Sequence, residues 1–466
     1  GTLGPSSNDA ETVSRMALAG MDVARLNSGH ADVDELVAYV RTARRAGEIA
    51  GKRISVMLDL QGPRLRVGSI RGSGVELHSG QTFTLTTAQK RGDESRVSVE
   101  YQGLPGDLAV GDRVFVDDGL IRMVVRSIED SDIVCEIVEG GVLLQGKGMN
   151  FPDSALALNT FTARDRHHLE ACLEEGIDWV AQSFVRTPSD LQEVTEAIER
   201  AGGSVPVMAK IEKSEAVDNI DEILAVAQGL MVARGDLGVE MPTEDVPLIQ
   251  KDIISRAQRA AVPVVTATQM LESMVEKPRP TRAEASDVAN AILDGTDAVM
   301  LSAETAIGHY PVQAVEMMVR IAARTEQELD YGRLLEERSG WAHRSPADAI
   351  GFAACKIAHD LGAKAIVTVT RSGYTARLVA RGRPEAQVIA VGPDPAVIRA
   401  TSVLWGVRGL VMELNENVDG MVSELSSACR KTGLVRAGDV IVIAGGFIGE
   451  ESSKTNMVHV HTVKAG

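Results

Sequence analysis

Lys210-Ile211-Glu212-Lys213 and, further along the chain, Ala233-Arg234-Gly235-Asp236-Leu237-Gly238-Val239-Glu240 are the two stretches that decide the fold. Each follows a compact apolar run, at 206–209 and at 229–232, of the kind that forms a buried parallel strand. Both stretches therefore lie where neighbouring strands end. In barrels of alternating strands and helices, that edge is where active sites are built.

Two carboxylates and a lysine stand at these strand ends. Glu212 and Asp236 offer the hard oxygen ligands that Mg²⁺ prefers, and Lys210 adds a point charge suited to a phosphate group. The two stretches together predict a magnesium-dependent phosphoryl site. A charged run after a single strand is usually only a solvated loop, so the prediction depends on residues at other strand ends.

The composition excludes several classes of function. The chain has 466 residues, of which 44% are apolar and 24% charged, which suits a large core divided among about two to four domains. A formal net charge of -17 argues against nucleic acid or an anionic membrane as the main partner. Only 3% of residues are aromatic, which leaves few platforms for stacking bases.

Cysteine usage and hydropathy predict a cytoplasmic location. Cys135, Cys172, Cys355 and Cys429 lie far apart without CxxC spacing, which is typical of buried thiols in a reducing compartment. No signal peptide is visible, and no apolar run approaches the roughly 20 residues of a membrane span. We therefore expect a soluble protein without a membrane partner.

Strand-like runs alternate with amphipathic, well-capped helical segments. The runs lie at 22–27, 54–60, 179–184, 205–211, 229–234, 263–268 and 298–302. Repeated strand–helix units predict parallel pairing, and these strands nearly complete a TIM (β/α)8 barrel. Thr2-Leu3-Gly4-Pro5 resembles the end of a first strand whose beginning is not in this chain, so the first barrel strand looks truncated. Either the sequence is trimmed or a short remnant fills the gap.

Two further modules interrupt or follow the barrel pattern. Short Val/Thr/Ile runs broken by turns predict an inserted small β-barrel lid domain. After the barrel, a helix near 346–361 and strands at 365–370, 387–391 and 439–444 predict a separate C-terminal α/β domain. The expected division of this α/β chain is 1–66 and 156–340 for the barrel, 67–155 for the lid and 341–466 for the C-terminal domain.

With this order of modules, the chain resembles pyruvate kinase over essentially its whole length. Any one matching run is weak evidence, but all of them occur in order and on the expected elements. The matching runs are Thr2-Leu3-Gly4-Pro5, Ala19-Gly20-Met21-Asp22-Val23-Ala24-Arg25-Leu26-Asn27, Leu58-Asp59-Leu60-Gln61-Gly62-Pro63, Ser183-Phe184-Val185-Arg186, the two opening stretches, Ala267-Thr268-Gln269-Met270-Leu271-Glu272-Ser273-Met274, Arg279-Pro280-Thr281-Arg282-Ala283-Glu284 and Met300-Leu301-Ser302-Ala303-Glu304-Thr305.

The resemblance implies transfer of a phosphoryl group from phosphoenolpyruvate to ADP, giving pyruvate and ATP. It implies that Glu212 and Asp236 hold Mg²⁺ or Mn²⁺, and that Lys210 stabilises the moving phosphoryl group. Arg25 and Arg66 are then the clamp on phosphoryl oxygens. Backbone N–H groups around Gly235 and Asp236, with the Thr268 hydroxyl, are expected to receive the substrate carboxylate.

The resemblance also implies roles for residues around this centre. Thr268, Ser302 and Glu304 are expected to relay the proton that enolpyruvate takes up at carbon. Lys147 matches a nucleotide-phosphate ligand, Arg66 adds a second, and His30 is expected near the nucleotide, although it could equally be a loop-packing residue. Asp117 and Asp118 match a hinge pair in the lid.

Departures from the family pattern predict independence from K⁺. K⁺-dependent members present Asn-Phe-Ser-His-Gly after the clamp arginine, whereas this chain has Gly29 in place of a hydroxyl ligand. Asp59-Leu60 replaces Asp-Thr, so Asn27 and Asp59 are what remains of a monovalent-cation site. Arg64 stands where K⁺-dependent members carry glutamate and K⁺-independent members carry lysine, and its guanidinium is expected to supply the missing positive charge.

A regulatory site is predicted in the C-terminal domain. Thr370, Arg371, Ser372, Gly373 and Thr375 lie at a strand-to-helix turn that suits a phosphate group. In the family this loop binds a phosphorylated activator and faces the run 445–449, and the subunits form homotetramers through which activation is transmitted. The same turn could be only a helix cap.

Two other functions stay open at this stage. One is another barrel enzyme acting on phosphoenolpyruvate or pyruvate, such as a metal-dependent aldolase or lyase, which would need neither the lid nor the C-terminal domain. The other is a catalytically weakened homologue that senses metabolites or serves as a scaffold. The altered cation site favours the second alternative, and the full set of phosphoryl-transfer residues argues against it.

Overall fold

Parallel strands curl into the central sheet of the computed structural model, which describes residues 1–341, 345–414, 418–446 and 455–464. The strands pair in the order β1-β2-β11-β12-β13-β14-β15. Their bounds are β1 Val23–Asn27, β2 Ser55–Asp59, β11 Trp179–Gln182, β12 Val207–Ile211, β13 Gly229–Ala233, β14 Val264–Ala267 and β15 Ala298–Val299. Every residue of β2, β12 and β13 is buried, as the apolar runs predict for strands covered on both faces.

The first residues of the chain close the ring between β15 and β1. Thr2 forms a parallel bridge with Arg25 of β1, and the Leu3 N–H donates to the Arg25 carbonyl at 2.9 Å. On the other side, the Thr2 N–H and hydroxyl both donate to the Leu301 carbonyl, at 3.0 and 2.9 Å. A short segment therefore fills the gap that the sequence left open, and the hydrogen-bonding edges of both neighbours are satisfied.

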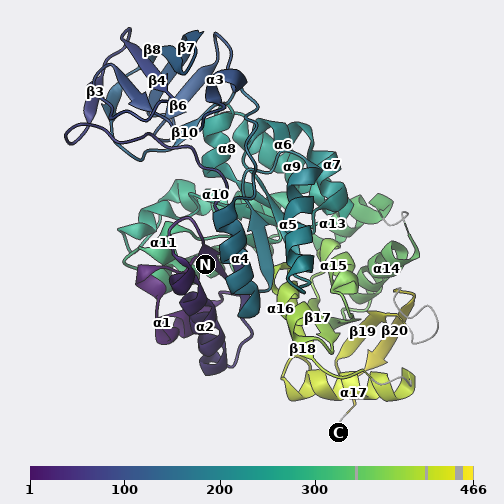
Figure 1. Cartoon of the computed structure of the whole chain (residues 1–466). Coiled ribbons are helices and arrows are strands. Elements are labelled where there is room, and N and C mark those ends of the chain that lie inside the picture. The colour runs from purple at the N-terminus through teal and green to yellow at the C-terminus, as the bar shows by residue number, and fades with distance from the viewer. Residues whose placement is uncertain (342–344, 415–417, 447–454, 465–466) are drawn as a thin grey trace.

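Helices surround this sheet and alternate with its strands (Figure 1). Their bounds are α1 Ala10–Ala19, α2 Val33–Ala50, α4 Ala163–Glu174, α5 Pro188–Arg200, α6 Ser214–Asp218, α7 Ile220–Val226, α8 Arg234–Glu240, α9 Val246–Ala260, α10 Arg282–Asp294, α11 Ala303–Ala306 and α12 Pro311–Glu326, with 3-10 turns η1 Pro5–Ser7 and η2 Glu272–Val275. Local sequence explains several ends: Thr281 and Glu284 cap the start of α10 reciprocally, and Gly295, with φ of 100°, ends it. The α/β barrel predicted from the sequence is confirmed.

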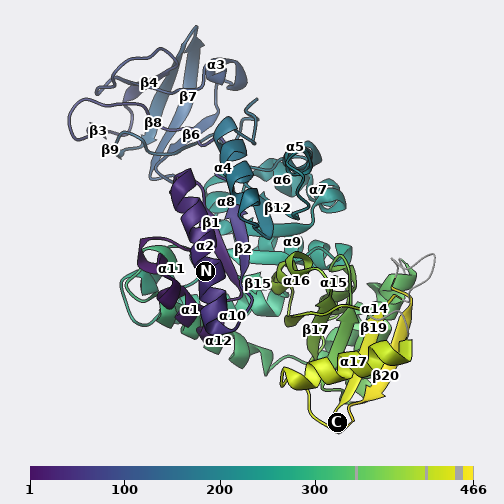
Figure 2. The same cartoon turned by 60° about the horizontal axis from the view of Figure 1, so that its bottom comes forward.

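A β module stands apart at the strand-end face of the barrel, as Figure 2 shows from a second direction. Its larger sheet has the order β10-β6-β7-β8-β4-β5, and β3 pairs with β9. The bounds are β3 Val75–Leu77, β4 Thr82–Thr86, β5 Arg96–Ser98, β6 Arg113–Val116, β7 Ile121–Glu129, β8 Asp132–Glu139, β9 Gly141–Leu143 and β10 Met149–Asn150, with α3 Leu104–Asp107. The module has its own core, in which Phe83 and Val125 are fully buried.

The last part of the chain forms a second α/β unit with the strand order β18-β17-β16-β19-β20. Its bounds are α13 Tyr331–Arg338, η3 Ser339–Trp341, α14 Pro346–Asp360, β16 Ala365–Val369, α15 Tyr374–Arg381, β17 Gln387–Gly392, α16 Pro395–Ala400, η4 Thr401–Val403, β18 Val407–Val411, α17 Val418–Lys431, β19 Val440–Gly445 and β20 Met457–Thr462. Sequence reasoning missed β18 and β20, because both are partly exposed outer strands that lack a continuous apolar run. Over the described residues, no helix combines the length and apolarity that crossing a membrane requires.

We predict that Thr2→Val weakens the closure of the barrel. The substitution keeps the shape of the side chain but removes a hydroxyl that donates to the Leu301 carbonyl and accepts from Arg25 at 2.9 Å. The Leu301 carbonyl keeps the bond from the Thr2 N–H, so the loss falls mainly on the Arg25 N–H, and leaving such a donor unsatisfied costs about 1–3 kcal/mol. Thermal unfolding followed by fluorescence of Trp179 in β11 should show a lower midpoint for Thr2→Val, whereas Thr2→Ser should stay close to the parent. Equal midpoints for all three proteins would contradict the role of Thr2.

Candidate active site

A cluster of buried charges joins three strands at their carboxyl ends. Lys210 at the end of β12 lies 2.7 Å from Glu212 and 3.1 Å from Asp59, measured from Nζ to the nearest carboxylate oxygen of each. It also donates to the Ser183 hydroxyl at 2.6 Å. Arg25 in β1 pairs through Nε with the other Asp59 oxygen at 2.6 Å. Lys210 is 8% exposed, and Asp59 and Glu212 are each 1% exposed, so two cations and two anions balance one another away from water.

The environment shifts the pKa of each member of the cluster. Burial alone lowers the pKa of Lys210, but Asp59 and Glu212 outweigh burial and raise it. Burial raises the pKa of Asp59, yet Arg25 and Lys210 together bring that pKa below its usual value. Burial raises the pKa of Glu212 and the charge of Asp236 adds to this effect, against the attraction of Lys210. The charge of Asp236 thus bears on both Glu212 and Lys210, which brings the two carboxylates of the opening stretches into one electrostatic neighbourhood.

A strained turn beside β13 carries the residues expected to receive a carboxylate. The Gly235 N–H donates to the Thr268 hydroxyl at 2.8 Å, and that hydroxyl donates to the Ala267 carbonyl at 2.6 Å. Thr268 and Gln269 have φ of 68° and 54°, a left-handed conformation that ordinary residues adopt mainly where the surroundings enforce it. The Gly235 amide is therefore already occupied, and it becomes available to a ligand only when its bond to Thr268 opens. Arg234 pairs with Asp287 at 2.7 Å and donates to the Thr268 carbonyl at 2.7 Å, and so holds this turn.

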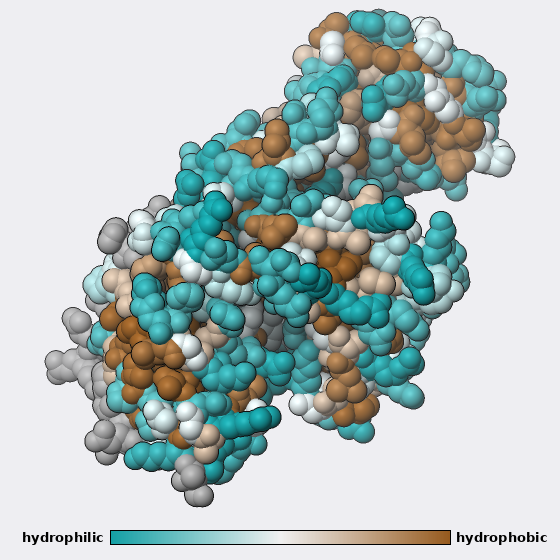
Figure 3. Space-filling view, turned by 180° about the vertical axis from the view of Figure 1, so that it is seen from behind, coloured by the Kyte–Doolittle hydropathy of each residue, from teal (hydrophilic) through white to brown (hydrophobic). Residues whose placement is uncertain are grey.

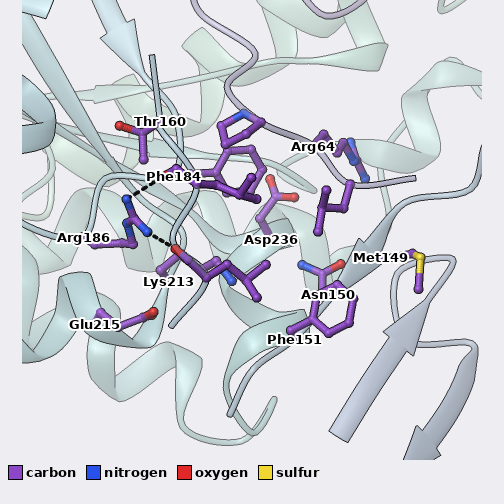
Figure 4. Close-up of a pocket in the computed structure, with 14 residues that line it drawn as sticks. Arg64, Met149, Asn150, Phe151, Thr160, Phe184, Arg186, Lys213, Glu215 and Asp236 are labelled. Atoms are coloured by element: carbon purple, nitrogen blue, oxygen red, sulfur yellow. Dashed lines mark hydrogen bonds between the residues drawn. The ribbon is translucent and has the colours of Figure 1, made fainter. Parts of the chain in front are cut away.

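Asp236 lies on the wall of a cavity of about 50 Å³ between the barrel and the chain that returns from the β module. Figure 4 shows its carboxylate between Arg64 on one side and Arg186 on the other. Within the described residues, Asp236 makes no hydrogen bond to another side chain. Arg186 instead donates to the carbonyls of Leu156 and Leu158 and so shapes the opposite wall.

Sequence reasoning missed a polar link beneath this cavity. Glu240 at the end of α8 accepts from Lys213 at 2.9 Å and from Asn150 of β10 at 2.8 Å, and both bonds end on its Oε1 atom. The link ties the module's last strand to the loops that follow β12 and β13. Lys213 and Glu240 are the final residues of the two opening stretches, and only their spatial proximity shows that they form a pair.

Ser302 and Glu304 differ in how their side chains are used. Glu304 is fully buried and accepts from the Leu271 N–H at 3.0 Å and from the Ser302 N–H at 2.7 Å. Its carboxylate therefore holds two loops together. The Ser302 hydroxyl is buried without a hydrogen-bond partner among the described residues. A buried free hydroxyl beside the site is the group of this pair that could exchange a proton with a ligand or water.

The predicted nucleotide residues gather on the side of the β module. Arg66 donates to the Gly146 carbonyl at 2.9 Å, and Lys147 pairs with Asp117 at 2.9 Å. Asp117 has φ of 54°, which marks a tight turn. The pKa of His30 lies below its ordinary value, because neighbouring protein displaces part of its water and because Arg25, Arg64 and Arg66 surround it with positive charge. The structure therefore brings His30 and the two clamp arginines into one region.

The two residues predicted to remain of a monovalent-cation site, Asn27 and Asp59, contact other groups of the protein. Asn27 accepts from the Gly29 N–H at 3.0 Å and lies opposite Asp59 in the register of β1 and β2. Both oxygens of Asp59 are taken by Arg25 and Lys210. Arg64 pairs with Asp118 of the β module at 3.2 Å rather than with Asp59. The positive charges beside Asp59 thus come from Lys210 and Arg25. That Arg64 supplies the charge of the missing K⁺ stays a prediction.

The predicted effector turn opens α15. Gly373 has φ of 80°, a conformation that favours glycine, and precedes the helix. Arg371 and Ser372 are exposed, Thr370 is buried, and Thr375 shares a buried 2.8 Å hydrogen bond with Thr455. Of the run 445–449 expected to face this turn, residues 447–449 lie outside the described residues.

Among the described residues, no three His, Cys, Asp or Glu side chains form a metal-binding group. Glu212 and Asp236, the pair predicted from the sequence, are two carboxylates whose charges act on each other. Mg²⁺ is commonly held by one or two carboxylates together with water and substrate oxygens, so this donor set fits it. The Lys210 ammonium lies against a Glu212 oxygen at 2.7 Å, which shows that this carboxylate is placed to contact a cation.

Comparison with known proteins gives consistent matches over the whole chain. A family model described as "Pyruvate kinase, barrel domain" matches residues 1–315, and one described as "Pyruvate kinase, alpha/beta domain" matches residues 348–461. The chain is 43% identical over 465 residues to a pyruvate kinase of Bacillus licheniformis and 41% identical over 464 residues to one of Staphylococcus aureus, in each case over 99% of this chain and 79% of the relative. The crystal structure of a pyruvate kinase from Cryptosporidium parvum superposes with a TM-score of 0.94 at 35% identity, over 99% of this chain and 95% of that chain.

We predict that Glu304→Gln lowers the stability of the barrel. One end of a glutamine amide can accept from a backbone N–H, but the other end would set an NH₂ group against the second N–H that Glu304 now satisfies. An unsatisfied buried donor costs about 1–3 kcal/mol. The midpoint of thermal unfolding should fall, and Glu328→Gln on the surface provides a control that should not change it. An unchanged midpoint for Glu304→Gln would show that its carboxylate does not hold the two loops.

Proposed function

The chain belongs to the pyruvate kinase family, and on that premise we propose that the buried cluster around Lys210 transfers a phosphoryl group from phosphoenolpyruvate to ADP. The products are ATP and, after enolpyruvate takes up a proton at carbon, pyruvate. The observation that carries the proposal is the convergence of Arg25, Asp59, Lys210 and Glu212 from three strand ends within salt-bridge distance. The family membership favours this reaction over that of an aldolase or lyase on the same substrate.

Arg25 and Lys210 are proposed to stabilise the phosphoryl group in the transition state of its transfer. Both are cations in a site closed to water, where charge–charge interactions are strong. Asp59 holds both of them in position, with contacts of 2.6 Å to Arg25 and 3.1 Å to Lys210. The three N–H groups of Lys210 are shared among Asp59, Glu212 and Ser183, so a phosphoryl oxygen would have to replace one of these acceptors. The protein groups are therefore positioned before the substrate binds, and little reorganisation is needed during the reaction.

Glu212 and Asp236 are proposed to hold Mg²⁺, or Mn²⁺ in its place. A divalent ion bound there would act as a Lewis acid on the oxygens of the substrate. Asp236 faces the cavity without a side-chain partner in the described chain, and Glu212 already contacts a cation. Thr268, Gly235 and the Asp236 backbone are proposed to bind the substrate carboxylate once the 2.8 Å bond between Gly235 and Thr268 opens.

The Ser302 hydroxyl is the proposed member of the proton relay that has a free hydrogen-bonding capacity. Its oxygen is buried with no partner among the described residues, whereas both oxygens of Glu304 accept from backbone N–H groups. We assign Glu304 the role of holding the loop that carries Ser302. Thr268, which follows the neighbouring strand β14, is assigned to the substrate carboxylate. The proton would reach carbon from water ordered by these hydroxyls.

Arg66, Lys147 and His30 are proposed to bind the nucleotide phosphates. Lys147 now pairs with Asp117 at 2.9 Å and Arg64 with Asp118 at 3.2 Å, so a phosphate group would compete with the hinge carboxylates for these cations. Such competition supports the proposal that the β module, 67–155, acts as a lid whose position responds to nucleotide. Closure would exclude water from the reacting phosphoryl group.

Regulation, assembly and location are further proposals. We propose that a phosphorylated effector is bound by the turn before α15, that is by Thr370, Arg371, Ser372, Gly373 and Thr375. The exposure of Arg371 and Ser372 just before the start of this helix supports the proposal. A homotetramer is supported by the outer strand β20, which pairs with β19 alone among the described strands and could pair with a second chain, and by the apolar groups on the C-terminal unit in Figure 3. Four buried, unpaired cysteines support a reducing, cytoplasmic location.

We predict that the parent protein forms pyruvate from phosphoenolpyruvate only when ADP and a divalent cation are present, and that Lys210→Met lowers turnover by about 10²–10³-fold. The substitution removes the charge that faces the phosphoryl group but leaves both proposed metal carboxylates in place. A coupled initial-rate assay, with EDTA as the metal-free arm, measures the loss, and Lys356→Met on the surface of α14 is the matched control.

Binding measurements separate this proposal from its main competitor. Lys210→Met should still bind Mn²⁺, detected by electron paramagnetic resonance. An inactive parent that binds phosphoenolpyruvate and Mn²⁺ normally would instead favour a metabolite sensor. Full activity of Lys210→Met would remove the lysine from the mechanism.

We predict that the enzyme has equal initial rates in sodium-only and potassium-only buffer. Two fixed cations already balance Asp59, so no monovalent ion is needed there. Arg64→Glu should leave this result unchanged if Lys210 and Arg25 supply the charge, but should create a need for K⁺ if Arg64 supplies it in the closed lid. Arg71→Glu, an exposed position of the same module, is the control. Strong stimulation of the parent by K⁺ would contradict the proposal.

A further inference from the structure

A group of four arginines is buried where the barrel meets the C-terminal unit, far from the chemistry described above. Arg338 ends α13, Arg377 and Arg381 lie one turn apart on α15, and Arg383 follows that helix. Arg338, Arg381 and Arg383 are less than a tenth exposed. The Arg338 guanidinium donates to the Arg381 carbonyl at 3.1 Å, which joins the end of α13 to the end of α15. Like charges one helical turn apart repel, so the arrangement needs a source of compensation.

Carboxylates compensate only half of this charge. Arg381 pairs with Asp348 at 2.8 Å, and Arg383 pairs with Asp297 at 2.7 Å. Arg338 has only neutral acceptors, the Arg381 carbonyl at 3.1 Å and Gln258 at 3.4 Å. In the described chain, four guanidinium groups thus contact two carboxylates.

Arg377 is the least satisfied of the group. It makes no ion pair within the described residues, and its guanidinium lies over the ring of Tyr374, 5.3 Å from the centroid. Its Nε atom is buried without an acceptor, and so is the Nε atom of Arg383. Buried donors in native proteins almost always have partners, so two orphaned N–H groups in one cationic cluster point to a missing acceptor.

Neighbouring acids do not supply that acceptor. Asp297 has one oxygen shared between Arg383 and the Trp405 N–H at 3.2 Å, while its other oxygen accepts from the Val264 N–H at 3.0 Å. Burial raises the pKa of Glu326 and outweighs the opposite effect of the positive charge of Arg383, so the ionised form of Glu326 is disfavoured. Burial together with repulsion from Arg383 lowers the pKa of Arg338 to about 9, which still leaves it charged at neutral pH.

A small cavity lies among these groups. Arg377, Arg381 and Arg383 line it together with Asp297 and the apolar residues around Leu404, and its volume is about 10 Å³. That space holds about one water-sized particle. A phosphate or sulfate is too large for it, whereas a monoatomic anion needs only a small shift of Arg377, which is half-buried and lacks a fixed partner.

We propose that this cavity is a binding site for one monoatomic anion of the chloride type, held by Arg377, Arg381 and Arg383 at the junction of the barrel and the C-terminal unit. The anion accepts from the two orphaned Nε–H groups and reduces the excess of positive charge. A water molecule could fill the same space but would leave the charge uncompensated. The anion thereby stabilises the packing of α15 against the barrel.

The first test compares thermal unfolding in sodium chloride and sodium gluconate at equal ionic strength. Chloride should raise the midpoint of the parent protein in a saturable manner, by an amount on the order of a few degrees, because it binds the folded state alone. Arg377→Met should lose this response. Arg436→Met, which removes an exposed arginine of the same unit, should keep it. Identical midpoints of the parent in both salts, or a full response of Arg377→Met, would overturn the proposal.

A second measurement needs no variant and identifies the occupant directly. Crystals of the parent grown in sodium bromide should give an anomalous peak within hydrogen-bond distance of Arg377 and Arg383. Density there without anomalous signal would identify water and refute the site. A saturable stabilisation by phosphate that exceeds that of chloride and depends on Arg377 would refute the monoatomic ligand.

Discussion

Charge balance among Arg25, Asp59, Lys210 and Glu212 is the constraint on which the rest of this structure depends. Each of these charges would be very costly if buried alone, and each is tolerable because the others lie within salt-bridge distance. The four residues come from β1, β2 and the end of β12, so the registers of these strands must all be correct for any of the charges to be paired. The requirement of the chemistry and the requirement of the fold are therefore the same.

Hydrogen bonds and ion pairs connect the loops around this cluster to the β module. Glu240 connects Lys213, which follows β12, to Asn150 in the strand that returns from the module. On the other side of the cavity, hinge carboxylates pair with Lys147 and Arg64, which the proposed function assigns to phosphate groups or to their vicinity. Movement of the module and occupation of the site must therefore exchange the same ionic contacts, which gives a physical basis for coupling between them.

The junction with the C-terminal unit follows the opposite rule. At the catalytic end the buried charges cancel one another, whereas around Arg377 and Arg383 the cations outnumber the carboxylates that contact them. An excess of one sign in a buried place is either relieved by a ligand or costs stability. Charge balance thus explains both clusters. The charges around Lys210 neutralise one another, whereas the arginines around Arg377 and Arg383 need an anion to reduce their excess of positive charge.

The sequence by itself determined the strands of the barrel and the order of the modules, because apolar runs and turns are encoded in short stretches. It also placed Lys210, Glu212 and Asp236 at the ends of two of these strands, because those residues directly follow or end the apolar runs. Only the tertiary structure decided which distant groups meet. It closed the ring with Thr2, paired Arg64 with Asp118, occupied both Glu304 oxygens, and added the outer strands β18 and β20. These outcomes depend on distances between segments far apart in the chain, and a linear pattern of residues carries no measure of such distances.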